Sequence, residues 1–153
     1  MDLESVKKIL EKGDGEYASV VDDLPQRFFE PFISYGIKID LVERGRLVCT
    51  LKVPPRLVNM GNFLHGGATA ELVDIVGSAV IHTVGAPSTG VSVEISVSYL
   101  DAAFLHEEVE IEAKVLHVGK TLAFVNVELR KKKTGKIVAQ GRHTKYLAVP
   151  SKL

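Results

Sequence analysis

The stretch from Asn59 to Asp74 constrains the fold of this chain more than any other part of its 153 residues. It predicts a short loop, a turn at His65-Gly66-Gly67, and then the first turns of a helix. Paired glycines allow backbone conformations that other residues avoid, and they let another group approach the chain closely. The helix, expected over roughly residues 68–83, is apolar on nearly every side, so it must lie inside the protein.

Asp74 interrupts this apolar helix about two turns after its start. A carboxylate is costly to bury unless it is paired or has a function. Gly66 lies where the helix begins, and a helix N-terminus favours developing negative charge. A helix that carries both an anion-stabilising end and a carboxylate suggests hydrolysis at a carbonyl. The alternative is a structural aspartate bonded to the backbone or to a neighbouring serine, and Glu71 is the competing carboxylate.

The composition excludes several classes of protein. Lys plus Arg and Asp plus Glu both number 19, so no overall charge recruits nucleic acid or an anionic membrane. Cys49 is the single cysteine and is expected to be a thiol in a core strand, and the five histidines lack metal-ligand spacing. We therefore expect no metal and no cofactor. We also expect no secretory signal and no membrane insertion.

The N-terminal region predicts a helical extension, covering about residues 1–30, on a single domain of residues 1–153. Apolar residues at helical spacing predict one amphipathic helix over 2–12 and a second piece over 16–24. The segment 25–35 contains two prolines and three phenylalanines and is expected to be an aromatic loop. It could cover the core or line an acyl tunnel, and the sequence leaves both open.

The remainder predicts an α+β fold, in which an antiparallel sheet of about six strands wraps around the apolar helix. Ser92 falls on the polar face of one strand, together with Glu94, Ser96 and Ser98. The edges of such a sheet invite a partner chain. The expected strands cover residues 37–43, 46–53, 89–100, 108–118, 121–132 and 136–149.

Four blocks of sequence resemble one known family, the hotdog-fold acyl-CoA thioesterases, including those of phenylacetate-pathway type. The resemblance spans roughly residues 33–147 and implies a hotdog fold. The blocks are Asn59 with His65-Gly66-Gly67 and Asp74; Gly90-Val91-Ser92-Val93; Gly119-Lys120-Thr121-Leu122-Ala123-Phe124; and Thr134-Gly135-Lys136 with Ala139-Gln140-Gly141-Arg142-His143-Thr144-Lys145.

The resemblance implies a homodimer, commonly paired into a homotetramer, with active sites at the dimer interface. It implies that Asn59, His65 and Gly66 of one chain meet Asp74 and Ser92 of the other. Asp74 would be the general base or the nucleophile, and the Gly66 N–H would stabilise the oxyanion. Ser92 would hold the water. His65 would orient the thioester and Asn59 would bind its carbonyl, or both would simply hold the loop.

The resemblance implies that six residues, named at the end of this paragraph, bind coenzyme A. Of these, Lys120 and Arg142 could contact its phosphates. The activity implied is hydrolysis of medium- to long-chain fatty acyl-CoA to fatty acid and CoA. The alternatives are hydrolysis of an aromatic acyl-CoA such as phenylacetyl- or dihydroxynaphthoyl-CoA, a hotdog hydratase or dehydratase, and a non-catalytic acyl-CoA-binding protein. The six residues are Tyr99, Gly119, Lys120, Thr121, Arg142 and Lys145.

The tripeptide Ser151-Lys152-Leu153 matches a peroxisomal address, which an import receptor reads. We therefore expect the peroxisome, with the cytosol as a second location. Acyl-CoA chemistry suits this compartment.

Overall fold

The computed structural model describes residues 2–11, 17–86, 88 and 90–147. The chain divides into two compact units, residues 1–32 and 33–153. This boundary falls next to the predicted end of the N-terminal extension. The tripeptide 151–153 lies outside the described residues, so the peroxisomal location stays a prediction.

The first unit contains α1 (Leu3–Leu10), α2 (Ala18–Asp22) and the start of α3 (Phe29–Ser34). The side chain of Asp2 caps α1 by accepting a hydrogen bond from the Ser5 N–H at 2.7 Å. The prediction that residues 25–35 form a loop is wrong, because α3 occupies part of them. Pro31 is the third residue of α3, where the missing N–H would have had no intrahelical partner.

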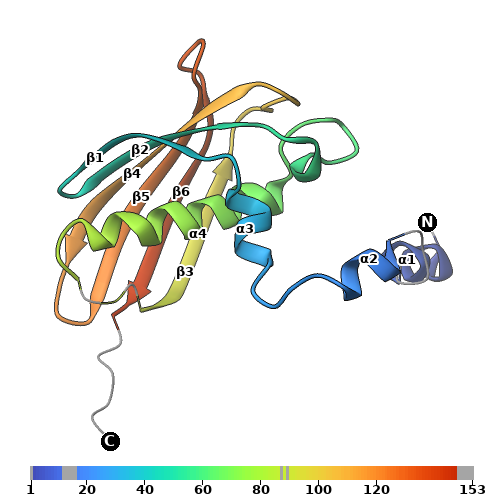
Figure 1. The fold of residues 1–153 in the computed structure, drawn as a ribbon, viewed down its shortest axis with the longest axis horizontal. Coiled ribbons are helices and arrows are strands. Elements are labelled where there is room, and N and C mark those ends of the chain that lie inside the picture. The colour runs from blue at the N-terminus through green and yellow to red at the C-terminus, as the bar shows by residue number, and fades with distance from the viewer. Residues whose placement is uncertain (1, 12–16, 87, 89, 148–153) are drawn as a thin grey trace, which may run out of the picture. The chain divides into compact units, whose positions relative to one another are not determined.

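The second unit contains a six-stranded antiparallel sheet in the order β1-β2-β4-β5-β6-β3, which confirms the predicted fold class (Figure 1). β3 crosses to the far edge of the sheet, where, among the described residues, β6 is its one paired strand. The strands cover Lys38–Glu43 (β1), Arg46–Lys52 (β2), Val91–Tyr99 (β3), Glu108–Val118 (β4), Leu122–Lys131 (β5) and Ile137–Tyr146 (β6). A short 3-10 helix, η2, covers Pro55–Leu57.

The long apolar helix α4 (Gly66–His82) lies across one face of this sheet (Figure 1). It begins two residues earlier than predicted, because His65 caps it: the His65 Nδ1 accepts a hydrogen bond from the Gly67 N–H at 2.9 Å. Its own residues Leu72, Val73, Val80 and Ile81 are fully buried. No helix among the described residues is long and apolar enough to cross a membrane.

Two glycines let α4 approach β6 closely. A Cβ on Gly141 of β6 would lie 2.7 Å from a Val73 methyl of α4. A Cβ on Gly77 of α4 would lie 3.0 Å from the His143 Nδ1 of β6. Both distances are too short for an ordinary side chain, so these positions set the gap between the two elements. Asp74, one turn before Gly77, is thereby held against β6.

A β-bulge in β3 changes which face Ser92 occupies. Ser92 pairs with Lys145 and Glu94 pairs with Thr144, so Val93 is an extra residue in the ladder. Directly paired residues point to the same face. Because Lys145 is buried beneath the helix, Ser92 also points to the helix, whereas Ser96 pairs with the exposed Arg142. The prediction that Ser92 shares a face with Glu94, Ser96 and Ser98 is therefore wrong.

Candidate active site

Asp74 is the centre of a polar cluster between α4, β3 and β6. Its Oδ1 accepts a hydrogen bond from the Ser92 Oγ at 3.0 Å and lies 3.5 Å from the Ser78 Oγ, one helical turn on. The His143 Nε2 lies 3.3 Å from the same oxygen. The Asp74 side chain is 32% exposed. Water can therefore reach this carboxylate, which a purely structural aspartate would not require.

His143 belongs to this cluster and was not predicted as a site residue. Its Nε2 lies 2.8 Å from the Ser92 Oγ, so the serine bridges the imidazole and the carboxylate. A signal in the sequence could have found it. The inward positions of β6 are Ala139, Gly141, His143 and Lys145, and the last two are polar where the alternation demands apolar or small residues.

The environment of His143 favours its neutral form. Burial lowers the pKa of this imidazole and Lys145 lowers it further, while Asp74 acts in the opposite direction. The side chain is fully buried, and its Nδ1 has no hydrogen-bond partner among the residues that the structure describes. A neutral imidazole beside Ser92 can exchange donor and acceptor roles with the hydroxyl without changing the charge of the cluster.

A second group of predicted residues surrounds the start of α4. The Asn59 Oδ1 accepts hydrogen bonds from the N–H groups of Gly61 at 2.9 Å and Phe63 at 3.3 Å. The Tyr99 hydroxyl donates to the Gly66 carbonyl at 2.7 Å. Asn59 and His65 therefore both hold backbone in this chain. The Gly66 N–H is one of the four helix-start donors that have no partner within the helix.

The two groups lie apart within one chain. Gly66 and Asp74 are eight residues apart on α4, which is about 12 Å along the helix axis. Ser92 and Tyr99 stand at opposite ends of β3, about 23 Å apart along an extended strand. The structure thus joins Asp74 with Ser92, and Gly66 with Tyr99, but it does not bring the two groups together in one subunit.

The predicted coenzyme A residues are also dispersed. The exposed residues Gly119, Lys120 and Thr121 form the turn between β4 and β5, near the Ser92 end of β3. Arg142 is exposed and lines a shallow polar hollow with Ser96 on the face away from α4. Lys145 is only 5% exposed, and its ammonium donates to the Ser78 Oγ at 2.8 Å. Lys145 therefore points into the subunit.

Other reactive groups lie elsewhere. Cys49 is fully buried in β2, and burial, with smaller contributions from Asp40 and Glu110, raises the pKa of its thiol to about 12. Among the described residues, no group of three or more His, Cys, Asp or Glu is arranged to hold a metal ion.

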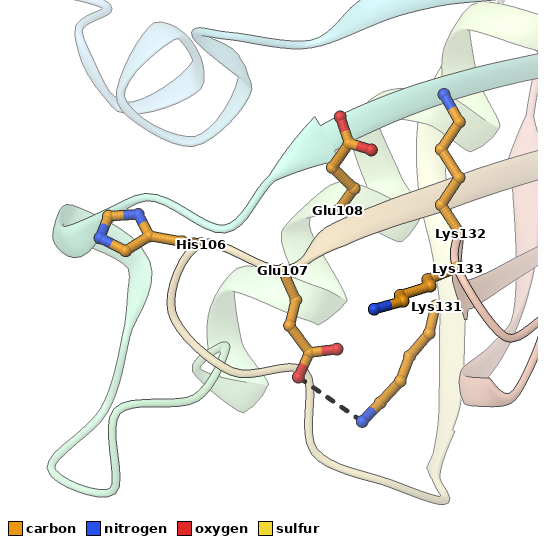
Figure 2. A pocket seen from close by; sticks show the side chains of 6 residues that line it. All are labelled: His106, Glu107, Glu108, Lys131, Lys132 and Lys133. Carbon is orange, nitrogen blue, oxygen red and sulfur yellow. Dashed lines mark ion pairs between the residues drawn. The ribbon is translucent and has the colours of Figure 1, made fainter.

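A further hollow, at the end of β5, contains the run Lys131-Lys132-Lys133, together with His106, Glu107 and Glu108 (Figure 2). The Lys131 ammonium lies 3.5 Å from a Glu107 carboxylate oxygen, and the Lys132 ammonium donates to the Thr50 Oγ1 at 3.0 Å. Two of the three lysines thus have partners of their own within the chain. This hollow lies at the opposite end of β5 from the Gly119–Thr121 turn.

Comparison with known proteins identifies the family. The sequence pattern of the family described as "Thioesterase superfamily" matches residues 61–138. The chain belongs to this superfamily. The matched region contains α4 with Asp74 and β3 with Ser92, and it ends inside β6 before His143.

Individual members of the superfamily cover most of the chain. Acyl-coenzyme A thioesterase 13 from Homo sapiens is 45% identical over 112 residues, which are 72% of this chain and 80% of that protein. The crystal structure of zebra fish thioesterase superfamily member 2 superposes with a TM-score of 0.76 at 36% identity, covering 97% of this chain and 99% of that one. A hypothetical thioesterase protein with coenzyme A, from Streptococcus pneumoniae, has a TM-score of 0.69 at 26% identity, covering 73% and 85%.

Proposed function

We propose that this protein hydrolyses the thioester of a fatty acyl-CoA of medium to long chain, releasing the fatty acid and CoA. The observation that carries the proposal is the water-accessible carboxylate of Asp74, bound to Ser92 inside an apolar fold of the thioesterase superfamily. The name of the human relative and the coenzyme A in the S. pneumoniae structure support the choice of substrate.

The cluster around Asp74 would activate water. The carboxylate takes a proton from water while the water oxygen attacks the carbonyl carbon, and Ser92 holds the carboxylate in place. The tetrahedral oxyanion then accepts a hydrogen bond from the Gly66 N–H, a contact typically worth about 2.7–4 kcal/mol of barrier. Collapse of the intermediate breaks the carbon–sulfur bond, and the proton on Asp74 is passed to the leaving thiolate.

A homodimer would complete this site. β3 is an edge strand whose Val91 and Val93 are 58% and 60% exposed. An exposed apolar edge invites pairing with another strand. If two copies of β3 pair antiparallel about a two-fold axis near Ile95, the Ser92 end of one copy lies beside the Tyr99 end of the other. Gly66 of one chain would then face Asp74 of its partner.

Complementation between subunits tests this arrangement. Asp74→Asn removes the base, and Gly66→Pro removes the oxyanion donor. Each variant alone should be nearly inactive. A mixed dimer formed by co-refolding should regain activity, because one of its two sites then contains no mutated residue. If Gly66 and Asp74 of the same chain served one site, every site would stay defective and mixing would restore nothing.

We also propose that dimers pair into a homotetramer. The outer face of the sheet carries carboxylates and guanidinium groups side by side, such as Glu110 and Arg130, which suits pairing with a second copy of the same face. Light scattering should give a mass near four times the 16.7 kDa of one chain. A mass near twice that value would limit the assembly to the dimer.

A thiol-release assay tests the reaction and the acyl group together. Purified protein is incubated with acyl-CoA esters of increasing chain length, with phenylacetyl-CoA and dihydroxynaphthoyl-CoA, and free CoA is captured. The highest kcat/KM should fall on aliphatic chains of medium to long length. A preference for the aromatic esters would replace the proposed substrate. Release of no thiol from any ester would refute hydrolysis and favour a binding protein or a hydratase.

A further inference from the structure

Lys145 is an unusual residue for its position. It occupies an inward-facing position of β6 beneath α4 and is 5% exposed. Lysine is almost never buried to this degree unless its charge is paired, because removing an ammonium group from water is costly. Its nearest strand neighbours on β5, Ala123 and Val125, are buried and apolar.

One hydrogen-bond partner of Lys145 leads back to Asp74. The Lys145 Nζ donates to the Ser78 Oγ at 2.8 Å, and the Ser78 Oγ lies 3.5 Å from the Asp74 Oδ1. Ser78 follows Asp74 by four residues, so both side chains emerge from the same side of α4. A hydroxyl that accepts from a cation is a better donor toward a carboxylate, because the two hydrogen bonds polarise each other. The cation therefore acts on Asp74 through one intervening residue.

The polar groups around Asp74 come from three elements. β6 contributes Lys145 and the imidazole of His143, while β3 contributes the neutral hydroxyl of Ser92 and α4 contributes that of Ser78. His143 is held neutral by its burial and by Lys145 itself. Among the groups that these contacts bring to Asp74, Lys145 supplies the positive charge.

We propose that Lys145 is a positioning residue of the hydrolytic site: acting through Ser78, its ammonium group holds the Asp74 carboxylate turned toward Ser92. This inference rests on the proposed function. It differs from contact between Lys145 and coenzyme A, which the resemblance implied, because such contact requires an ammonium that reaches the surface.

Substitution of Lys145 by methionine tests the two roles. Lys145→Met keeps most of the length and the apolar stem of the side chain and removes its charge. We expect kcat to fall about ten- to a hundredfold with little change in KM. The same loss should appear with an acyl-N-acetylcysteamine thioester, which has no phosphate. Lys145→Arg should recover part of the kcat. Lys114→Met, on the outer face of β4, is the matched control and should leave both constants unchanged.

A raised KM for acyl-CoA, with normal kcat and normal turnover of the truncated thioester, would instead place Lys145 on a phosphate and overturn the proposal. Unchanged constants for both substrates would overturn it as well. If Lys145→Met does not fold, Ser78→Ala breaks the same link while leaving the lysine in place, and it should lower kcat in the same way for both thioesters.

An NMR titration of His143 gives a readout that does not depend on activity. Lys145 lowers the pKa of His143, so this pKa should rise in Lys145→Met and stay unchanged in Lys114→Met. An unchanged value in Lys145→Met would show that the ammonium is not beside the cluster, and the proposal would fail. If the wild-type protein released no thiol while His143 still responded, the proposed function would fail but the location of the charge would stand.

Discussion

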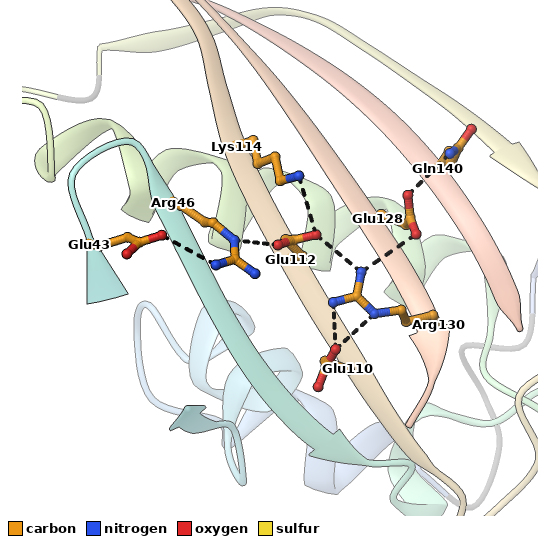
Figure 3. A network of polar contacts seen from close by, with 8 residues as sticks. All are labelled: Glu43, Arg46, Glu110, Glu112, Lys114, Glu128, Arg130 and Gln140. Atoms are coloured by element: carbon orange, nitrogen blue, oxygen red, sulfur yellow. Dashed lines mark hydrogen bonds and ion pairs between the residues drawn. The ribbon is translucent and has the colours of Figure 1, made fainter. Parts of the chain in front are cut away.

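The two faces of the sheet use the same kinds of charged groups in opposite ways. On the outer face, carboxylates and cations form an open network in which the Arg130 Nε donates to Glu110 at 2.8 Å and the Arg46 Nε donates to Glu112 at 2.5 Å (Figure 3). On the inner face, the hydroxyls of Ser78 and Ser92 lie beside the Asp74 carboxylate. The Lys145 ammonium is linked to this carboxylate through Ser78. The outer network also includes Glu43, Lys114, Glu128 and Gln140.

The difference shows where charge is used for chemistry. Ion pairs near the surface exchange contacts with water for contacts with each other, so each contributes little to stability. Buried polar groups cost much more, and they persist where their arrangement does something that an apolar core could not. Each prediction below changes a residue on one face and asks whether activity or stability responds.

The largest effect should come from Asp74→Asn. This change keeps the shape of the side chain and removes the proposed base, so kcat should fall about a thousandfold while the melting temperature stays close to wild type. Steady-state thiol release and a thermal melt measure the two quantities. Glu71→Gln, three residues earlier on the same helix, is the matched control and should retain activity within a few fold. The reverse result would assign the reaction to Glu71.

A smaller loss should follow from Ser92→Ala. Removing the hydrogen bond to a carboxylate should lower kcat about ten- to a hundredfold, because bonds to charged groups are worth about 1.5–3 kcal/mol. Ser96→Ala changes the same residue type on the same strand but on the opposite face, so it should have no effect on kcat. Equal losses in both variants would mean that the bulge at Val93 does not separate the two serines.

Gly141→Ala should affect stability before activity. The new methyl group would lie 2.7 Å from Val73, so α4 must shift away from β6. We expect a loss of about 1–3 kcal/mol in the free energy of unfolding, measured by urea denaturation. Gly119→Ala is the control for stability, because its nearest neighbours would be at 3.7 Å, an ordinary contact distance.

Substitutions on the outer face should have small effects. Arg130→Met removes hydrogen bonds to Glu110 and Glu112 and should cost about 1 kcal/mol or less, less still at high salt, with kcat unchanged. Urea denaturation at two salt concentrations measures the first quantity, and thiol release measures the second. A large loss of activity would contradict the division of roles between the two faces.

The smallest effects should appear in the pH dependence of stability, where a group on each face titrates in a different pH range. Burial lowers the pKa of His143 below the ordinary 6.5, so the unfolded chain binds more protons there, and stability should fall as the pH drops below about 6.5. For Glu112, burial would raise the pKa, but hydrogen bonds from Arg46 and Arg130 outweigh it. With its pKa lowered below 4.5, Glu112 should lose its contribution only below that pH.

Melting temperatures between pH 7.5 and pH 3 distinguish these contributions. His143→Gln should flatten the upper part of the profile, and Glu112→Gln should flatten the lower part. If His143→Gln left the profile between pH 6.5 and 5 unchanged, the imidazole would not be the group that titrates there.

The sequence by itself determined the architecture and singled out the carboxylate at the centre of the candidate site. Period-two alternation predicted six strands, an all-round apolar pattern predicted a buried helix, and a lone carboxylate in that helix pointed to Asp74. These signals are local, since each depends on a few residues that must face one environment. Even so, the pattern misjudged residues 25–35, because a proline in the first turn of a helix looks like a helix breaker in the sequence.

The tertiary structure decided which side chains meet. No local pattern shows that β3 crosses the sheet to pair with β6, or that the extra residue Val93 turns Ser92 toward the helix. Those two features join Ser92, His143 and Asp74, which are distant in sequence, and they direct Lys145 to Ser78 rather than to the surface. The register of strand pairing is set by non-local packing, and a shift of one residue exchanges the inner and outer faces.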